Sequence, residues 1–332
     1  MPFSYDPQIL AVFQAMLGKE DRPKVPIGDV ETRRKNLDAF FAPIAATLAP
    51  PAGTVTITDY HTTTSDGHTL LLRWFMPTTL HEPSKGSAWV YAHGGGMIAG
   101  SVEVLTPIIA RNVVSASVPL LAVDYRLAPE VQAPVPVTDS YAGLQWLHEH
   151  AAELGVDPKR IGVIGESAGG GIAASLAHYV KQQHEKHSGS PDVIPSLQRQ
   201  ILIYPMLDDR TTTSAVEKEI EPFLLWSRDD NETGWNALLG SRRGGPDVTV
   251  VEAAGRTNVE QARGLPPAYI DVGELDLFRQ EDIAYVQTLG LAGVSCEFHI
   301  IPGAPHAFEA AAAASETVQL CMKARIRHLQ SI

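Results

Sequence analysis

The sequence predicts an α/β fold in which a mostly parallel central sheet is flanked by helices. Short apolar stretches with the character of strands alternate with longer stretches of helical periodicity along most of the chain. Such strands are typical of a parallel sheet that is buried on both faces. Hydrophobic residues make up 44% and charged residues 19% of the 332 residues, as expected for a folded chain with a substantial core.

The predicted elements follow one another in a regular order. Apolar residues at helical spacing, ended by Pro50-Pro51, predict an N-terminal helical arm over residues 1–50. The turn Ser65-Asp66-Gly67 predicts a hairpin of strands at 55–59 and 70–76. Further strands are predicted at 88–92, 119–123, 160–164, 201–204, 268–272 and 295–301, and further helices at 102–115, 135–150, 168–183, 222–239, 277–289 and 306–329.

The domain organisation follows from this order. The sequence shows no internal repeat and no low-complexity linker. Residues 51–332 are therefore predicted to form one sheet-based domain. A helical insertion at about 207–240 and the arm formed by residues 1–50 are predicted to build a helical cap over it.

The strongest local signal is the segment Gly165-Glu166-Ser167-Ala168-Gly169, which matches the pattern G-x-S-x-G. It lies between the predicted strand 160–164 and the predicted helix 168–183, the context in which this pattern forms a tight turn that exposes a nucleophilic serine. The glycines leave room for neighbouring backbone, and the following helix directs its free N–H groups at the serine. The pattern therefore favours Ser167 as a nucleophile over a plain tight turn.

A glycine-rich loop, His93-Gly94-Gly95-Gly96, follows a predicted strand directly. Glycine amides can approach a negatively charged oxygen closely, and one such donor contributes about 10²–10³ to the rate of acyl transfer. The phosphate-binding patterns G-x-x-x-x-G-K-[ST] and G-x-G-x-x-G are absent here, which argues against a nucleotide cradle. We therefore expect an oxyanion hole built from the amides of Gly94, Gly95 and Ala168, with His93 in a structural role.

A nucleophilic serine needs a base, and His306 is the strongest candidate among the 12 histidines. It lies in a loop directly after the last predicted strand, at the carboxyl edge of the parallel strands where ligand sites gather. His299 lies within that strand and is expected to pack. The remaining histidines of interest fall at a helix end, where we expect solvated side chains: His178, His184 and His187.

The base needs an acid that orients it, and the chain order for this type of turn is serine, acid, histidine. Asp276 and Glu274 share the loop that follows the predicted strand 268–272. Asp271 lies within the strand, so its side chain is not expected to reach the loop. We favour Asp276 and keep Glu274 as the alternative; Asp276 could also simply cap the helix that follows it.

Together these motifs resemble the hormone-sensitive-lipase-like family of carboxylesterases, which has the α/β-hydrolase fold. The resemblance implies a triad of Ser167, Asp276 and His306, the Gly94, Gly95 and Ala168 oxyanion hole, and a cap. The matching segments are His93-Gly94-Gly95-Gly96, Asp124-Tyr125-Arg126-Leu127-Ala128-Pro129-Glu130, Gly165-Glu166-Ser167-Ala168-Gly169-Gly170, Tyr204-Pro205 and Gly303-Ala304-Pro305-His306.

Some residues depart from the family's pattern. Glu166 stands where the family usually has aspartate or threonine, and Gln280 where it often has a second acid. Met97 stands where an aromatic residue often follows the triple glycine, which leaves the shape of the acyl pocket open. The segment from Asp124 to Glu130 is expected to be structural, with Arg126 pinning the loop beneath the site.

The predicted activity is hydrolysis of short-chain acyl or small neutral esters by a serine acyl-enzyme mechanism, without metal or cofactor. Lactones and amides fit the same machinery. The alternatives are a ligand-binding receptor and a structural protein on an inactive hydrolase scaffold; the presence of all three triad residue types argues against both. The candidates for substrate-binding residues, which could instead pack the cap on the core, are Met97, Ile98, Phe223, Leu224, Leu225 and Trp226.

Composition limits the partners. The net charge of −12 argues against binding to phosphate backbones, so no nucleic acid is expected. No secretory signal and no membrane span are recognised, and a cytoplasmic protein is the default expectation. Cys296 and Cys321 are expected to be reduced packing residues. A small-molecule ester is the expected partner, and a homodimer is left open.

Overall fold

The computed structural model describes residues 3–17, 24–80, 86–187, 194–211 and 215–332. In these residues an eight-stranded sheet has the order β1-β2-β4-β3-β5-β6-β7-β8. β2 runs antiparallel to β1 and β4, and all other neighbours are parallel, so the predicted mostly parallel sheet is confirmed. The strands are β1 (Val55–Thr63), β2 (Thr69–Pro77), β3 (Gly86–Ala92), β4 (Leu120–Val123), β5 (Val156–Glu166), β6 (Gln200–Ile203), β7 (Ala268–Gly273) and β8 (Cys296–Ile301).

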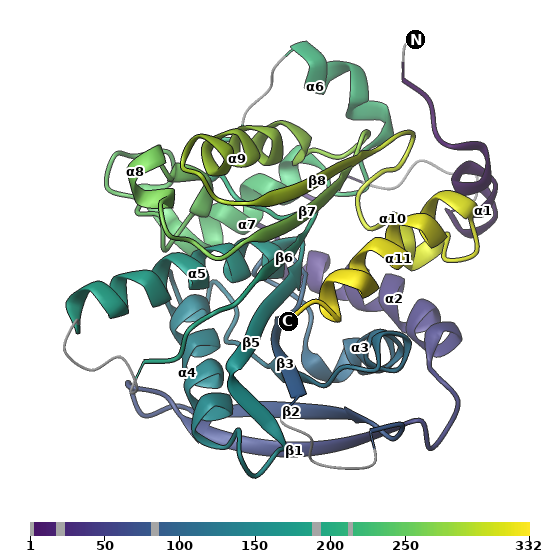
Figure 1. Ribbon diagram of the computed structural model, residues 1–332. Helices are drawn as coiled ribbons and strands as arrows, with labels where there is room; N and C mark the ends of the chain where they lie inside the picture. The colour runs from purple at the N-terminus through teal and green to yellow at the C-terminus, as the bar shows by residue number, and fades with distance from the viewer. Residues whose placement is uncertain (1–2, 18–23, 81–85, 188–193, 212–214) are drawn as a thin grey trace.

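Helices cover both faces of the sheet (Figure 1). One side carries α4, α5 and α9, and the other carries α3 and α11, with α1 and α2 beyond them. The longer helices are α1 (Pro7–Leu17), α2 (Val30–Leu48), α3 (Val102–Ala116), α4 (Val135–Glu149), α5 (Ala168–Lys186), α7 (Arg228–Leu239), α9 (Arg279–Leu291) and α11 (Glu316–Leu329). The shorter ones are α6 (Ala215–Ile220), η1 (Glu221–Phe223), η2 (Gly240–Arg242), η3 (Ala254–Arg256), α8 (Val259–Ala262) and α10 (Phe308–Ala311).

Alternating side chains of the central strands pack into two separate hydrophobic clusters, one on each face of the sheet. In β6, Leu202 packs into the cluster beneath α4 and α5, whereas Ile201 and Ile203 pack into the cluster beneath α3 and α11. All four residues of β6 are buried. Because both faces are covered, these strands read as continuous apolar runs in the sequence.

The predicted cap insertion differs in detail from the expected single helix at 222–239. The structure divides this stretch into η1 and α7, with the residues around Trp226 forming a turn between them. α7 begins after Ser227, whose side chain accepts from the Asp230 amide, while the Asp230 carboxylate accepts from the Ser227 amide. This capping box fixes where α7 starts.

Two arginines tie α2 to the rest of the molecule. Arg34 donates to the carbonyls of Ile98 (2.6 Å) and Ala128 (3.0 Å) and pairs with Glu130 (2.6 Å). Arg33 is buried and pairs with Asp230 of α7 (2.8 Å). Arg34 thus holds α2 against the sheet domain, partly through Ala128 and Glu130 of a segment that matches the family, and Arg33 holds it against α7.

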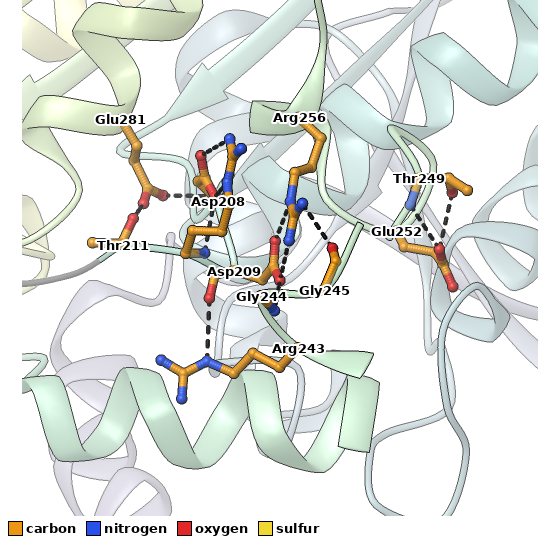
Figure 2. A network of polar contacts seen from close by, with 11 residues as sticks. Asp208, Asp209, Thr211, Arg243, Gly244, Gly245, Thr249, Glu252, Arg256 and Glu281 are labelled. Atoms are coloured by element: carbon orange, nitrogen blue, oxygen red, sulfur yellow. Dashed lines mark hydrogen bonds and ion pairs between the residues drawn. The ribbon is translucent and has the colours of Figure 1, made fainter. Parts of the chain in front are cut away.

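A polar network holds the chain between β6 and α8 in place (Figure 2). The carboxylate of Asp209, which is fully buried, accepts from Arg256 through two hydrogen bonds of 2.7 and 2.8 Å and from the Gly244 amide at 2.6 Å. Arg256 also donates to the Gly245 carbonyl, and Arg243 donates to the Asp209 carbonyl. Asp209 therefore joins the loop after β6 to the segment that follows α7.

Candidate active site

Ser167 occupies the turn between β5 and α5, with φ of 57° and ψ of −122°. This positive φ is a strained conformation for a residue other than glycine. The flanking glycines make the turn feasible: a Cβ at Gly165 would lie 2.2 Å from the Gly169 carbonyl oxygen, and one at Gly169 would lie 2.0 Å from the Ala92 oxygen. The glycines of the pattern are therefore needed because the backbones of β5, α5 and the end of β3 approach one another closely at this turn.

A continuous hydrogen-bonded chain joins Ser167, His306 and Asp276. The Ser167 Oγ lies 2.9 Å from His306 Nε2, and His306 Nδ1 lies 2.7 Å from Asp276 Oδ2. A carboxylate can only accept, so Asp276 favours the tautomer with the proton on Nδ1, which leaves Nε2 free to accept the serine proton. All three side chains are buried or nearly so, at 7%, 7% and 0% exposed for Ser167, His306 and Asp276.

The two competing acids have separate partners. The second oxygen of Asp276 accepts from the Phe278 amide at 3.0 Å, so the carboxylate is held at both oxygens. Glu274 instead accepts from the Gly303 amide at 3.0 Å and braces the loop that carries His306. Asp271 is paired with Arg325 in the core.

Aromatic rings fix the imidazole of His306. The ring of Tyr204 meets it edge to face with centroids 4.6 Å apart, and Phe278 meets it similarly at 5.2 Å. Such contacts restrict the ring orientation without using its nitrogens. The imidazole is therefore held by packing as well as by its two hydrogen bonds.

The glycine loop faces the serine. A Cβ at Gly94 would lie 3.4 Å from the Ser167 Cβ, so the loop passes directly over the turn. The amides of Gly95, Gly96 and Ala168 donate to no acceptor within the described residues. The Gly94 amide differs from these in lying close enough to the Glu166 carboxylate to lower its pKa.

His93 is buried beneath the loop, as expected of a structural residue. Its Nδ1 lies 2.7 Å from the Gly94 carbonyl oxygen, and its ring stacks on Tyr125 at 4.2 Å between centroids. The Tyr125 hydroxyl donates to the His93 carbonyl at 2.7 Å. Burial lowers the pKa of His93, which favours the neutral ring in this position.

Glu166 has surroundings that sequence reasoning did not foresee. Burial raises its pKa to about 7, and hydrogen bonds from Tyr91 and from the Gly94 amide oppose this shift. The Tyr91 hydroxyl donates to the Glu166 carboxylate. Glu166 thus links β3 and the glycine loop to the nucleophile turn.

A cavity of about 870 Å³ opens onto the Ser167 hydroxyl. Its lining includes Ser167, His306 and the three glycines, together with Leu224, Leu225 and Trp226. A Cβ at Gly96 would lie 2.3 Å from the Trp226 ring, which places that ring against the glycine loop. Cavities of this size accommodate molecules much larger than a simple acetate ester.

The other predicted lining residues lie elsewhere, and these expectations are corrected. Met97 and Ile98 turn into the core, at 3% and 0% exposed, and the Met97 side chain lines a separate small void near Trp235. Phe223 is not part of the cavity lining; its ring packs edge to face on Tyr5 at 5.1 Å. The position after a glycine triplet does not determine whether its side chain faces the ligand or the core.

Several polar lining residues were missed by the sequence argument. Glu309 accepts from Tyr204 at 2.5 Å and from Arg325 at 2.8 Å, and all three line the cavity. Arg325 also makes two bonds of 2.7 Å to Asp271. Glu309 follows His306 by three residues, which is the single sequence signal that could have drawn attention to it.

A mostly parallel sheet, with a serine in the turn after β5 and a histidine after β8, defines the α/β-hydrolase class. The family described as the alpha/beta hydrolase fold matches residues 89–310. The ethyl acetate hydrolase of Pseudomonas putida is 29% identical over 322 residues, which cover 92% of each chain. The esterase LipI of Mycobacterium tuberculosis is 33% identical over 228 residues, or 68% of this chain and 67% of that one.

Solved structures agree with these relatives. A bacterial heroin esterase superposes with a TM-score of 0.84 at 31% identity, covering 100% of this chain and 99% of that chain. The esterase LipW of Mycobacterium marinum superposes with a TM-score of 0.80 at 29% identity, covering 98% and 95%. The chain therefore belongs to the hormone-sensitive-lipase-like family of α/β hydrolases and is a carboxylesterase.

None of the helices in the described ranges is long and apolar enough to cross a bilayer. Within the same ranges, no group of three histidine, cysteine or acidic side chains is arranged to hold a metal ion.

Proposed function

We propose that the chain hydrolyses carboxylic esters through an acyl-enzyme on Ser167, with His306 as general base and acid and Asp276 as the orienting carboxylate. The observation that carries this proposal is the hydrogen-bonded chain of 2.9 and 2.7 Å that joins the three side chains. It opens onto a cavity with room for an ester.

The reaction takes place in two steps. The Ser167 oxygen attacks the ester carbonyl while its proton passes to His306 Nε2, and the imidazolium that forms is stabilised by Asp276. His306 then protonates the leaving alcohol. Water, activated by the same imidazole, attacks the acyl-enzyme and releases the acid.

The oxyanion of each tetrahedral intermediate needs donors that have no other acceptor. We assign Gly95 and Ala168 to this role, in agreement with the sequence-based expectation. We add Gly96, whose amide has no acceptor among the described residues, and prefer it to Gly94, which lies against Glu166 and lowers the pKa of that carboxyl. Each such donor contributes about 10²–10³ to kcat.

Residues 1–50 and 207–240 form the cap in this proposal. The pairing of Arg33 with Asp230 and the position of Leu224, Leu225 and Trp226 along the cavity support it. Short-chain acyl groups are the substrates expected beside Ser167, as the name of the Pseudomonas putida relative suggests. The protein acts without metal or cofactor, and in the cytoplasm.

The direct assay compares wild type and Ser167→Ala on p-nitrophenyl acetate and butyrate. We expect the wild type to release p-nitrophenol and Ser167→Ala to lose activity by roughly 10⁴–10⁶ in kcat. Ser175→Ala, which alters a buried serine on α5 outside the main cavity, is the matched control. Equal rates from wild type and Ser167→Ala would remove the proposal.

A further inference from the structure

We propose that the substrate carries a carboxylate several carbon atoms away from the ester that is cleaved, and that Arg111 of α3 binds this carboxylate in the cavity. The inference rests on the proposed ester hydrolysis at Ser167 and deepens it. It names a charged group on the part of the substrate that does not react.

Arg111 belongs to the side of α3 that lines the cavity, where α2 and α11 pack beside this helix (Figure 1). Leu105, Ile108 and Arg111 follow one another at intervals of three residues, and all three are part of the lining. Residues at this spacing lie on one side of a helix. The Arg111 side chain is partly buried, so its guanidinium is a cation in the wall of the cavity and not a fully solvated surface charge.

The guanidinium of Arg111 has no anionic partner in the part of the chain that the structure describes. It makes no hydrogen bond and no ion pair there. The positions three and four residues away on α3 hold no acid. A guanidinium has five N–H donors, and leaving such donors unpaired while they are partly buried costs free energy. Their acceptor therefore has to come from water or from a ligand in the cavity.

The neighbouring charges of the lining differ from Arg111 because they have partners within the protein. Arg325 donates to Glu309 at 2.8 Å and makes two bonds of 2.7 Å to Asp271. The Glu166 carboxylate accepts from a tyrosine hydroxyl of β3. These groups supply one another with donors and acceptors, whereas the donors of Arg111 are available to a ligand.

A carboxylate is the group that fits these donors best. The planar guanidinium can bind both carboxylate oxygens at once, and an ammonium group at the same place would be repelled. Asn112, the next residue, also lines the cavity and adds amide N–H donors. The net charge of −12 gives an anion no general attraction to this protein, so a preference for a carboxylate has to come from such local contacts.

The position of Arg111 along α3 sets how far the carboxylate lies from the ester. α3 begins at Val102, shortly after the glycine loop that faces Ser167. From Leu105 to Arg111 the lining extends about 9 Å along the helix axis. An extended chain advances roughly 1.2 Å per bond, since a residue of three backbone bonds spans about 3.3–3.6 Å. About six to eight carbon atoms therefore separate the two groups.

The carboxylate can belong to the acid or to the alcohol of the ester, and two pairs of substrates separate these sources. One pair is the mono-p-nitrophenyl ester of suberic acid and the p-nitrophenyl ester of suberamic acid. The other is acetoxyoctanoate and acetoxyoctanamide, with the acetoxy group on the terminal carbon. Each pair differs in a carboxylate against a neutral amide of the same shape.

We expect the carboxylate in one pair to have a kcat/KM roughly tenfold or more above that of its amide at neutral pH and low ionic strength. The ratio should fall as salt is added, because the Arg111 side chain is partly exposed and its charge is screened. A smaller ratio in both pairs at low ionic strength would overturn the proposal.

Substitution of the arginine tests where the carboxylate binds. Arg111→Gln should bring the ratio of carboxylate to amide close to one, and Arg111→Lys should keep part of it because a cation remains. Arg111→Met serves if the glutamine variant does not fold, as judged by circular dichroism. Arg263→Gln is the matched control: Arg263 lies outside the lining, pairs with Glu260 at 3.2 Å, and should keep the wild-type ratio.

The outcomes distinguish this inference from the proposed function. If neither carboxylate nor amide of either pair is hydrolysed and p-nitrophenyl acetate is not hydrolysed, ester hydrolysis itself fails. If esters are hydrolysed but a folded Arg111→Gln or Arg111→Met variant keeps the wild-type ratio, ester hydrolysis stands and Arg111 is not the site of the carboxylate.

Discussion

Replacing His306 by alanine is expected to lower kcat for ester hydrolysis by roughly 10⁴–10⁶ while the protein stays folded. The imidazole is the sole group within hydrogen-bond distance of the Ser167 Oγ among the described side chains, at 2.9 Å. Without it the hydroxyl has no base, and the leaving alcohol has no proton donor. Steady-state kinetics with p-nitrophenyl butyrate give the size of the loss, and circular dichroism reports the fold.

A second histidine provides the control for this variant. His299 lies within β8, the strand that leads into the loop of His306, and its partner is Glu297 at 2.8 Å. His299→Ala should therefore keep kcat within a few-fold of wild type. Comparable losses in both variants would show that the activity depends on the integrity of this part of the fold and not on the imidazole of His306.

Replacing Arg256 by methionine is expected to lower the free energy of unfolding by about 3–5 kcal/mol. The change removes both hydrogen bonds of 2.7 and 2.8 Å to Asp209 and leaves a fully buried carboxylate without its cation. Among the described residues, the Gly244 amide is then the one remaining donor to this carboxylate. Urea unfolding at pH 7 measures the loss.

The control and the rescue make this prediction specific. Arg263→Met breaks a well-exposed pair with Glu260 and should cost less than about 1 kcal/mol. Adding Asp209→Asn to Arg256→Met should restore part of the stability, because the unpaired charge is gone. A loss below 1 kcal/mol for Arg256→Met would contradict the conclusion that the polar network in Figure 2 stabilises the fold.

The contribution of the Arg256–Asp209 pair to the free energy of unfolding depends on pH, and the direction of this dependence follows from the pKa of Asp209. Burial raises the pKa of Asp209, but the hydrogen bonds from Arg256 and Gly244 outweigh this and leave its pKa below the ordinary value. As the pH falls, Asp209 therefore takes up its proton at a higher pH in the unfolded state than in the folded state. The stability that this carboxylate contributes is present above the unfolded pKa of about 4 and is lost as the pH falls through the folded pKa.

The sheet could be predicted because its signals are local. Buried parallel strands give apolar runs, and the G-x-S-x-G pattern between a strand and a helix marks the turn of Ser167. The loops after β7 and β8 end at the same edge, which is why Asp276 and His306 could be named before the structure was known. Their hydrogen-bonded geometry is now described, and their catalytic roles stay predictions.

The cavity could not be predicted because it depends on packing between distant helices. Met97 has φ of 63° and is turned into the core, whereas Trp226, far along the chain, lies against Gly96. The volume arises where α2, α3 and α11 leave space, and no single segment encodes that space. The size of the cavity therefore could not be predicted, although the residues around Ser167 were named.

The burial of some polar side chains also could not be predicted from the sequence. His178, expected at a solvated helix end, is 2% exposed, and burial lowers its pKa to about 3. Asp282 is fully buried with no hydrogen-bond partner for either oxygen among the described residues, and burial raises its pKa well above the ordinary range. Which face of a helix is covered depends on neighbours that composition does not reveal.

The most direct measurement is the mass of the intact protein after incubation with diethyl p-nitrophenyl phosphate. A nucleophilic serine attacks the phosphorus of this reagent, displaces p-nitrophenolate and becomes a stable diethylphosphoryl ester. The account predicts one diethylphosphoryl group per chain, located on Ser167 by peptide mapping and absent in Ser167→Ala, with loss of ester hydrolysis in parallel. Labelling of another residue with the same loss of activity, or full hydrolysis by a chain that carries the label on Ser167, would contradict it.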